Sequence, residues 1–209
     1  MKKLFLFTLI LGLFMNAEAQ KKESVVKFVI HTDYGDMKGF LYNETPQHRD
    51  NFVKLVNEGW YNGSPFHRVI NKFMIQGGQN ADGRQDPGYR IPAEFNAKFF
   101  HKKGALAAAR MGDQVNPKRE SSGSQFYVVQ GDVLNDQMIA MMESRGTKFS
   151  PEQKEAYKKI GGTPHLDAQY TVFGEITEGL DVVDKIAAVK TVPGDKPATD
   201  VKMTIKIVK

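Results

Sequence analysis

An arginine stands inside an otherwise apolar stretch of this chain, where a charged side chain is unusual. Arg68 lies within FHRVINKFMIQGG, residues 66–78. A second stretch, GSQFYVV at 123–129, places Gln125 and Tyr127 on one face of a strand, because alternate residues of a strand share a face. A guanidinium, amides and aromatic rings on strand faces make an unusual core, and they indicate the floor of a binding cleft.

The same arginine also has a purely structural interpretation. Its aliphatic stem can pack over the wall of a barrel while its charged end pairs at the rim. The spacing alone leaves both interpretations open. If Arg68 has a chemical role, that role is the donation of charge-assisted hydrogen bonds.

Residue type and spacing exclude other kinds of site. The five histidines, at positions 31, 48, 67, 101 and 165, show no metal-ligand spacing, and the chain has no cysteine. Disulfides and thiol catalysis are therefore excluded. The sequence contains neither a G-x-S-x-G elbow nor a Walker-type phosphate loop, and it predicts no cofactor and no metal.

The elements that must position these residues are mostly short strands. Residues 25–32 are rich in β-branched side chains, a turn follows at 33–36, and 37–42 would return as the second strand of a hairpin. Residues 201–208 alternate apolar and polar side chains, which is typical of a half-buried strand. Many short strands favour a closed or nearly closed antiparallel barrel.

Two helices are expected to pack on this barrel. Thr45 would be an N-cap with Pro46 at the first helical position, and apolar residues then recur at helical spacing until Gly59. A second apolar stripe at helical spacing is formed by Leu180, Val183, Ile186 and Ala187.

Residues 132–163 interrupt the pattern of short strands, and their sequence predicts an inserted helical hairpin. Ser150 fits an N-cap, Pro151 the first helical position and Gln153 the capping-box position. Four apolar residues of the insert fall on one face: Leu134, Met138, Met141 and Met142. They either pack the hairpin onto the barrel or form an adaptable binding surface, which methionine suits.

Three segments resemble the cyclophilin family, in the same order. They are FHRVI-x-x-FMIQGG, GSQFYVV and HLDAQYTVFGEI at 165–176, and the likeness runs from about residue 25 to the C-terminus apart from 132–163. The resemblance implies a mainly β fold, an eight-stranded antiparallel barrel capped by two helices, with a cleft on its outer face. It also implies a peptidyl-prolyl cis-trans isomerase without cofactors, acting on proline-containing unfolded or partly folded polypeptides.

The resemblance assigns roles to individual residues. Arg68 falls at the family's catalytic arginine, while Phe73, Met74 and Leu166 fall in its proline pocket. The full set at substrate-binding positions is Phe73, Met74, Gln76, Ala109, Arg110, Gln125, Tyr127, His165, Leu166 and Tyr170.

Four of these positions depart from the commonest pattern of the family. Tyr127 stands where the pocket usually has Phe, and its added hydroxyl needs a partner. Tyr170 replaces a common His, and Arg110 replaces Asn and adds charge at the rim. His165 stands where a Trp occurs in members most sensitive to cyclosporin, so reduced sensitivity is expected. These changes bear on inhibitor affinity and substrate preference more than on activity.

The chain also begins with an expected export signal. Lys2 and Lys3 precede a short apolar run, and Ala17–Ala19 fits a small-x-small cleavage site. The run is short for a bilayer span, so we expect residues 1–19 to be cleaved. The exported domain would be residues 20–209, periplasmic or else secreted. An uncleaved amphipathic anchor is the alternative.

The composition of the chain limits which classes of partner are expected after cleavage. No second hydrophobic stretch follows the signal, so no stable membrane insertion is expected after cleavage. The formal charge of +5 is spread along the chain, which gives little support for nucleic-acid binding. A monomer is expected. Two competing functions remain: a barrel that holds unfolded exported chains, and a dedicated assembly partner of one envelope protein, for which the sequence offers no positive feature.

Overall fold

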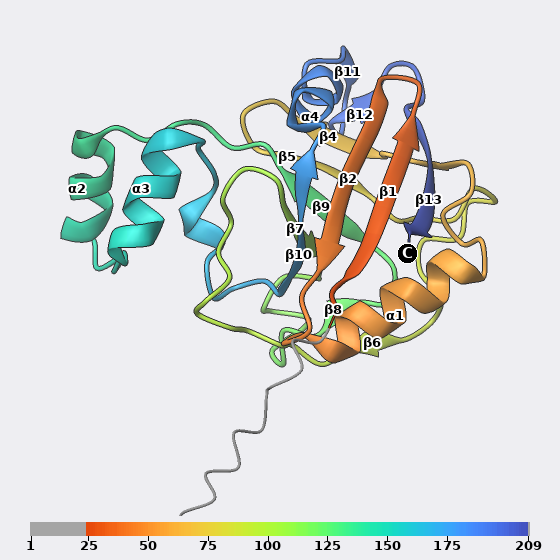
Figure 1. The fold of residues 1–209 in the computed structure, drawn as a ribbon, viewed down its shortest axis with the longest axis horizontal. Helices are drawn as coiled ribbons and strands as arrows, with labels where there is room; N and C mark the ends of the chain where they lie inside the picture. Colours follow the sequence, from red (N-terminus) through yellow and green to blue (C-terminus); the bar gives the residue numbers. More distant parts are fainter. Residues whose placement is uncertain (1–23, 209) are drawn as a thin grey trace, which may run out of the picture.

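Nine strands form one antiparallel sheet at the centre of the computed structural model, which describes residues 24–208. These strands are β1 Val26–Thr32, β2 Gly35–Leu41, β3 Ser64–Pro65, β4 Arg68–Ile70, β5 Met74–Gly77, β7 Ala105–Ala108, β9 Phe126–Val129, β10 Val172–Glu178 and β13 Lys202–Val208. Their order across the sheet is β3-β13-β1-β2-β10-β7-β9-β5-β4, and the part β13-β1-β2-β10 can be followed in Figure 1. Two small sheets pair β6 Arg90–Ile91 with β8 Ser121–Ser122, and β11 Thr191–Val192 with β12 Lys196–Pro197.

The two edge strands of the main sheet are neighbours in sequence. β3 pairs with β13 and β4 pairs with β5, yet only Phe66 and His67 separate β3 from β4. The sheet must therefore curl until its two edges meet. The family resemblance implied an eight-stranded barrel, whereas the main sheet has nine strands, the two shortest of which, β3 and β4, flank these two residues.

The interior of the curled sheet is filled by alternate residues of its strands. β1 and β13 lie opposite each other with Ile30 facing Ile205, and Ile30, Met203 and Ile205 are all buried. The predicted alternation of the C-terminal strand is therefore confirmed. On β9, Phe126 points into this core, whereas Tyr127 belongs to a second apolar cluster on the other face.

Two helices cover the ends of the barrel, α1 Pro46–Asn57 and α4 Leu180–Ala187 (Figure 1). Thr45 does take the N-cap position, but its hydroxyl caps no helical N–H. The cap comes instead from a distant carboxylate: Glu94 accepts hydrogen bonds from the N–H groups of Gln47 (3.1 Å) and His48 (3.0 Å). A negative charge at a helix N-terminus also suits the helix dipole.

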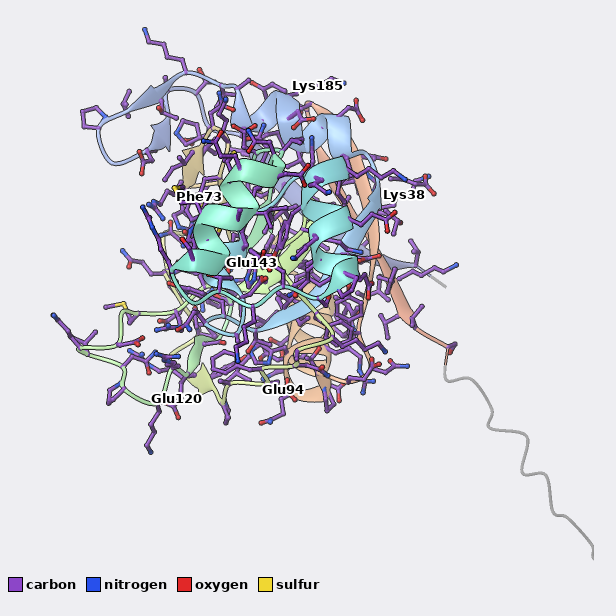
Figure 2. The ribbon with its side chains drawn as sticks, turned by 90° about the vertical axis from the view of Figure 1, so that its left-hand side faces the viewer. Lys38, Phe73, Glu94, Glu120, Glu143 and Lys185 are labelled. Carbon is purple, nitrogen blue, oxygen red and sulfur yellow. The ribbon has the colours of Figure 1, made fainter. Side chains whose placement is uncertain are left out.

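A helical hairpin stands to one side of the barrel and consists of α2 Asp136–Ser144 and α3 Pro151–Lys159 (Figures 1 and 2). The capping box of Ser150 and Gln153 is present as predicted. The hairpin begins and ends at one point, because Asp132 pairs with Gly162. The chain then continues into the short 3₁₀ helix η1, Pro164–Leu166.

The face that α2 buries is only partly the one predicted, since Leu134 is buried and Met142 is partly buried against the same core. Ile139 and Leu134 pack with Phe100 and Tyr157 in a small separate core. Met138 and Met141 are instead 39% and 47% exposed, so of the two interpretations offered, packing does not hold for these two methionines. Their i, i+3 spacing correctly indicated a shared face, but that face is turned to solvent.

Within residues 24–208, no helix is long and apolar enough to span a lipid bilayer. The expected signal sequence, residues 1–19, lies outside the described part of the chain.

Candidate active site

Three neighbouring strands place a row of polar and aromatic side chains across one face of the sheet. In the register of β4, β5 and β9, Arg68 lies opposite Gln76, and Gln76 lies opposite Tyr127. Directly opposed residues on adjacent strands are close enough for their side chains to interact. The row lines a cleft of about 240 Å³, and the cleft contains nine of the eleven predicted site residues: Arg68, Phe73, Met74, Gln76, Ala109, Arg110, Tyr127, Leu166 and Tyr170.

Arg68 is held at the edge of this cleft by an acidic residue that the sequence analysis missed. Its Nε donates a hydrogen bond to Oδ2 of Asp195 over 3.2 Å. The backbone N–H of Val69 also donates to the Asp195 carbonyl, at 2.8 Å, which fixes the β11–β12 turn against β4. Among the described residues, neither Nη1 nor Nη2 of Arg68 has a hydrogen-bond partner, so both can donate into the cleft.

The apolar part of the cleft is a ring-sized seat made by Phe73, Met74, Tyr127 and Leu166. Met74 and Tyr127 are buried, while Phe73 and Leu166 are partly buried against them. His165 does not line this cleft. Its imidazole stacks on the Phe73 ring with centroids 5.7 Å apart, and it borders an adjoining hollow on the hairpin side. Figure 2, in which Phe73 is labelled, looks at the molecule from this side.

Gln125 lies one step further along the surface, in a second cleft of about 240 Å³ that shares Gln76, Ala109 and Arg110 with the first. Gln76 donates to the Gln125 side-chain oxygen at 3.2 Å. Close approach of the two segments depends on Gly78, because a Cβ at that position would overlap the carbonyl of Ser124. Its φ of +100° also favours glycine.

Arg110, predicted to add charge at the rim of the cleft, is paired and largely covered. Its side chain is only 5% exposed, and its Nη1 pairs with Asp113 over 2.6 Å. Its Nε donates to the Gln169 carbonyl at 2.9 Å. The guanidinium lies 4.5 Å above the centroid of the Tyr170 ring, a cation–π arrangement. Arg110 therefore braces the Tyr170 wall of the cleft.

The extra hydroxyl of Tyr127 has a buried partner. It lies 2.9 Å from Nε2 of His101, and His101 in turn contacts Asp167 through Nδ1 at 2.9 Å. Burial raises the pKa of Tyr127 well above its ordinary value, so the hydroxyl keeps its proton. Sequence reasoning missed both His101 and Asp167: Asp167 lies inside the HLDAQYTVFGEI segment next to Leu166, but its partner His101 is 66 positions away along the chain.

His67, which separates β3 from β4, is a titratable group beside the catalytic candidate. Burial, with a smaller contribution from the charge of Arg68, lowers the pKa of His67 to about 4. Its Nδ1 is buried and makes no hydrogen bond with any described residue. The folded protein therefore disfavours the protonated imidazole.

The free energy of unfolding is expected to decrease as the pH falls from about 6.5 to 4. An unfolded His67 binds a proton near pH 6.5, whereas the folded one does so only near 4. Protons then bind preferentially to the unfolded chain throughout this window. Urea denaturation of the wild type and His67→Gln at pH 7, 5.5 and 4.5 measures the contribution. The variant should lose less stability, and parallel losses in both proteins would contradict the assignment.

The arrangement offers donors and an apolar seat rather than a reactive centre. Among residues 24–208, no group of three His, Asp or Glu side chains is placed to hold a metal ion. The cleft carries the guanidinium of Arg68 at its edge, the amide of Gln76 along one side and an apolar floor. Such a site can bind an extended peptide, seat one small ring and donate hydrogen bonds beside it.

Comparisons with known proteins agree with this geometry. Residues 27–207 match the model of the family described as cyclophilin type peptidyl-prolyl cis-trans isomerase/CLD. The chain is 38% identical over 201 residues to a protein of Staphylococcus saprophyticus named as a peptidyl-prolyl cis-trans isomerase, covering 93% of this chain and 96% of that relative. A Staphylococcus aureus protein of the same name is 38% identical over 192 residues, covering 90% and 92%.

Among solved structures, the fold is similar to a cyclophilin type peptidyl-prolyl cis-trans isomerase of Cryptosporidium parvum. The TM-score is 0.65 at 22% identity, over 89% of this chain and 99% of that one. A crystal structure of the same protein in the presence of the dipeptide Ala-Pro gives a TM-score of 0.63 at 22% identity, over 88% and 99%. The family match and the extent of the sequence identity establish that this chain belongs to the cyclophilin-type peptidyl-prolyl cis-trans isomerases.

Proposed function

We propose that this isomerase rotates X-Pro peptide bonds of exported polypeptides, with Arg68 as its catalytic group. The observation that carries the proposal is the row Arg68, Gln76 and Tyr127 across three paired strands, beside an apolar seat in the same cleft. The solved relative crystallised in the presence of Ala-Pro supports a proline-containing substrate. The basic and apolar start of the sequence supports export.

The cleft would act by binding the twisted peptide bond better than the planar one. Rotation about an X-Pro bond faces a barrier of roughly 18–20 kcal/mol because the amide is resonance-stabilised. In the twisted state the proline nitrogen becomes pyramidal and basic, and Arg68 can donate a hydrogen bond to it. The planar nitrogen cannot accept that bond, so the interaction favours the transition state alone.

The apolar seat and the amides would supply orientation. Phe73, Met74, Tyr127 and Leu166 would hold the pyrrolidine ring still while the preceding carbonyl turns, and Gln76 would anchor the substrate backbone. Shortening exchange from tens of seconds to milliseconds requires ~10⁴-fold acceleration, about 5.5 kcal/mol. A charge-assisted hydrogen bond in a partly desolvated cleft, together with fixed orientation, is sufficient for this.

The test is a protease-coupled assay on a panel of short X-Pro peptides that differ in the residue before proline. The purified protein at submicromolar concentration is expected to accelerate cis-to-trans exchange. The observed rate constant should rise linearly with the concentration of the protein. The panel also reports the residue preferred before proline. Exchange at the uncatalysed rate with every peptide would contradict the proposal.

A second candidate function, holding of unfolded chains by the hairpin, is favoured by the exposure of Met138 and Met141. Val133, at the base of the hairpin, is also exposed. Aggregation of a proline-free unfolded client separates the two functions, because isomerisation cannot help such a client. Suppression that is lost in the double variant Met138→Ser, Met141→Ser would favour holding. Equal aggregation with and without the protein would remove this candidate.

A further inference from the structure

A continuous line of hydrogen-bonded polar side chains, buried or partly buried, connects the floor of the cleft to the hairpin. Tyr127 contacts His101 over 2.9 Å, and His101 contacts Asp167 over 2.9 Å. The hydroxyl of Tyr157, on α3, donates to the other oxygen of Asp167 at 2.6 Å. Gln153, also on α3, donates to that same oxygen at 3.3 Å. The line thus runs from β9 to α3.

Every polar atom along this line is satisfied. A carboxylate has about four acceptor sites, and Asp167 accepts four hydrogen bonds, two from the His101 backbone N–H and ring and two from α3. His101 and Tyr157 are fully buried and Tyr127 nearly so. Buried polar groups are costly unless they are paired, and a fully paired network holds its members in one arrangement.

The direction of donation fixes the orientation of the Tyr127 ring. A carboxylate only accepts, so the proton of His101 lies on Nδ1, and Nε2 then accepts from the Tyr127 hydroxyl. Burial raises the pKa of both Tyr127 and Tyr157, so both hydroxyls remain donors at neutral pH. The ring of Tyr127 therefore points its hydroxyl into the wall of the protein and presents its edge and face to the cleft.

Asp167 also controls a second wall of the cleft. It follows η1 directly, and η1 carries Leu166, which lines the cleft, and His165, which stacks on Phe73. An anchor on Asp167 therefore fixes the Leu166 side of the proline seat as well as its Tyr127 floor. The two α3 groups that hold Asp167 belong to the hairpin, far from the reacting bond.

We propose that the α2–α3 hairpin positions the proline cleft, with Tyr157 and Gln153 acting as positioning residues through Asp167 and His101 on Tyr127 and η1. This inference rests on the proposed function, because it concerns the same cleft. It assigns the hairpin a role in activity toward any X-Pro peptide, independent of client binding by its exposed methionines.

The test is a double-mutant cycle between the two ends of the line. Tyr157→Phe removes one hydroxyl on α3 and should lower kcat/KM on an X-Pro peptide by about fivefold, chiefly by raising KM, since coupling through such networks is modest. Tyr127→Phe breaks the line at the cleft. In that background, Tyr157→Phe should lower kcat/KM by clearly less than it does in the wild type, because the route from α3 to the Tyr127 floor is cut and only the route through Asp167 to η1 remains.

Ser150→Ala is the matched control. It removes the N-cap hydroxyl of the same helix and so lowers the stability of the hairpin, yet it removes none of the groups in the line. It should leave kcat/KM within about 1.5-fold of the wild type. Gln153→Leu gives a second test of the α3 anchor if Tyr157→Phe folds poorly, and it should raise KM in the same direction.

Two outcomes would overturn the inference. One is unchanged kinetics in both α3 variants, and the other is an equal loss from Tyr157→Phe in the two backgrounds, which a general loosening of the fold would give. Failure of the proposed function is distinguished by Arg68→Ala. If that variant keeps full activity, the site assignment fails as a whole, whereas an inactive Arg68→Ala with normal α3 variants rejects only the role of the hairpin.

Discussion

Arg68→Ala is expected to lower kcat/KM for X-Pro peptides by about 10²- to 10³-fold, the range found when one preorganised transition-state donor is removed. The fold should survive. The Arg68 side chain is 42% exposed, and its ion pair is with Asp195, itself 45% exposed. Exposed pairs of this kind contribute less than about 1 kcal/mol to stability. The measurement is the protease-coupled rate together with a urea denaturation curve for each protein.

Two further variants sharpen this test. Arg68→Lys keeps the charge but loses the planar fork that can contact Asp195 and substrate together, so an intermediate loss is expected. Arg145→Ala removes another exposed arginine, just after α2, and should leave the rate unchanged. Near-normal turnover in Arg68→Ala would show that Arg68 has the structural role instead, with its stem packed on the barrel.

Phe126→Ala is expected to lower the free energy of unfolding by about 3–5 kcal/mol. Phe126 is 1% exposed, and its ring meets three others edge-on, Phe52 at 5.8 Å, Tyr61 at 5.6 Å and Phe66 at 6.4 Å between centroids. Its loss leaves a cavity that these rings cannot fill without leaving their own contacts. A loss of this size is a large share of the stability of an ordinary domain.

Phe95→Ala provides the comparison for this variant, because Phe95 is 40% exposed and its removal should cost less than about 1 kcal/mol. Urea denaturation at pH 7 measures both. The outcome also bears on the cleft, because Phe126 and Tyr127 are adjacent on β9, with Phe126 facing the core and Tyr127 facing the cleft. A loss below about 1 kcal/mol for Phe126→Ala would mean that the aromatic cluster is not the centre of the core.

Local signals in the sequence predicted local features of this protein well. The alternation of side chains along a strand correctly placed Phe126 and Tyr127 on opposite faces of the sheet. The capping box at Ser150 and Gln153 correctly marked the start of α3. Nine of the eleven proposed site residues lie around one cleft. Their selection relied on matching segments of a known family, because spacing alone could not distinguish a catalytic arginine from a packed one.

Features that depend on pairs far apart in the chain could not be predicted in this way. Arg68 and Asp195 are 127 positions apart, and nothing in the turn around Asp195 indicates which side chain it will meet. The cap of α1 by Glu94 is a second example, since a local threonine was available and was not used. The burial of Ile139 in place of Met138 and Met141 likewise depends on where Phe100 and Tyr157 are placed.

The two-residue connection between β3 and β4 limits how readily another polypeptide can add to the main sheet of this protein. An open sheet edge presents unpaired N–H and C=O groups, and a partly folded polypeptide can add to it as another strand and start aggregation. Here the edges of the main sheet are only two and three residues long and run into each other. Another polypeptide therefore finds little backbone to pair with at the edges of the main sheet.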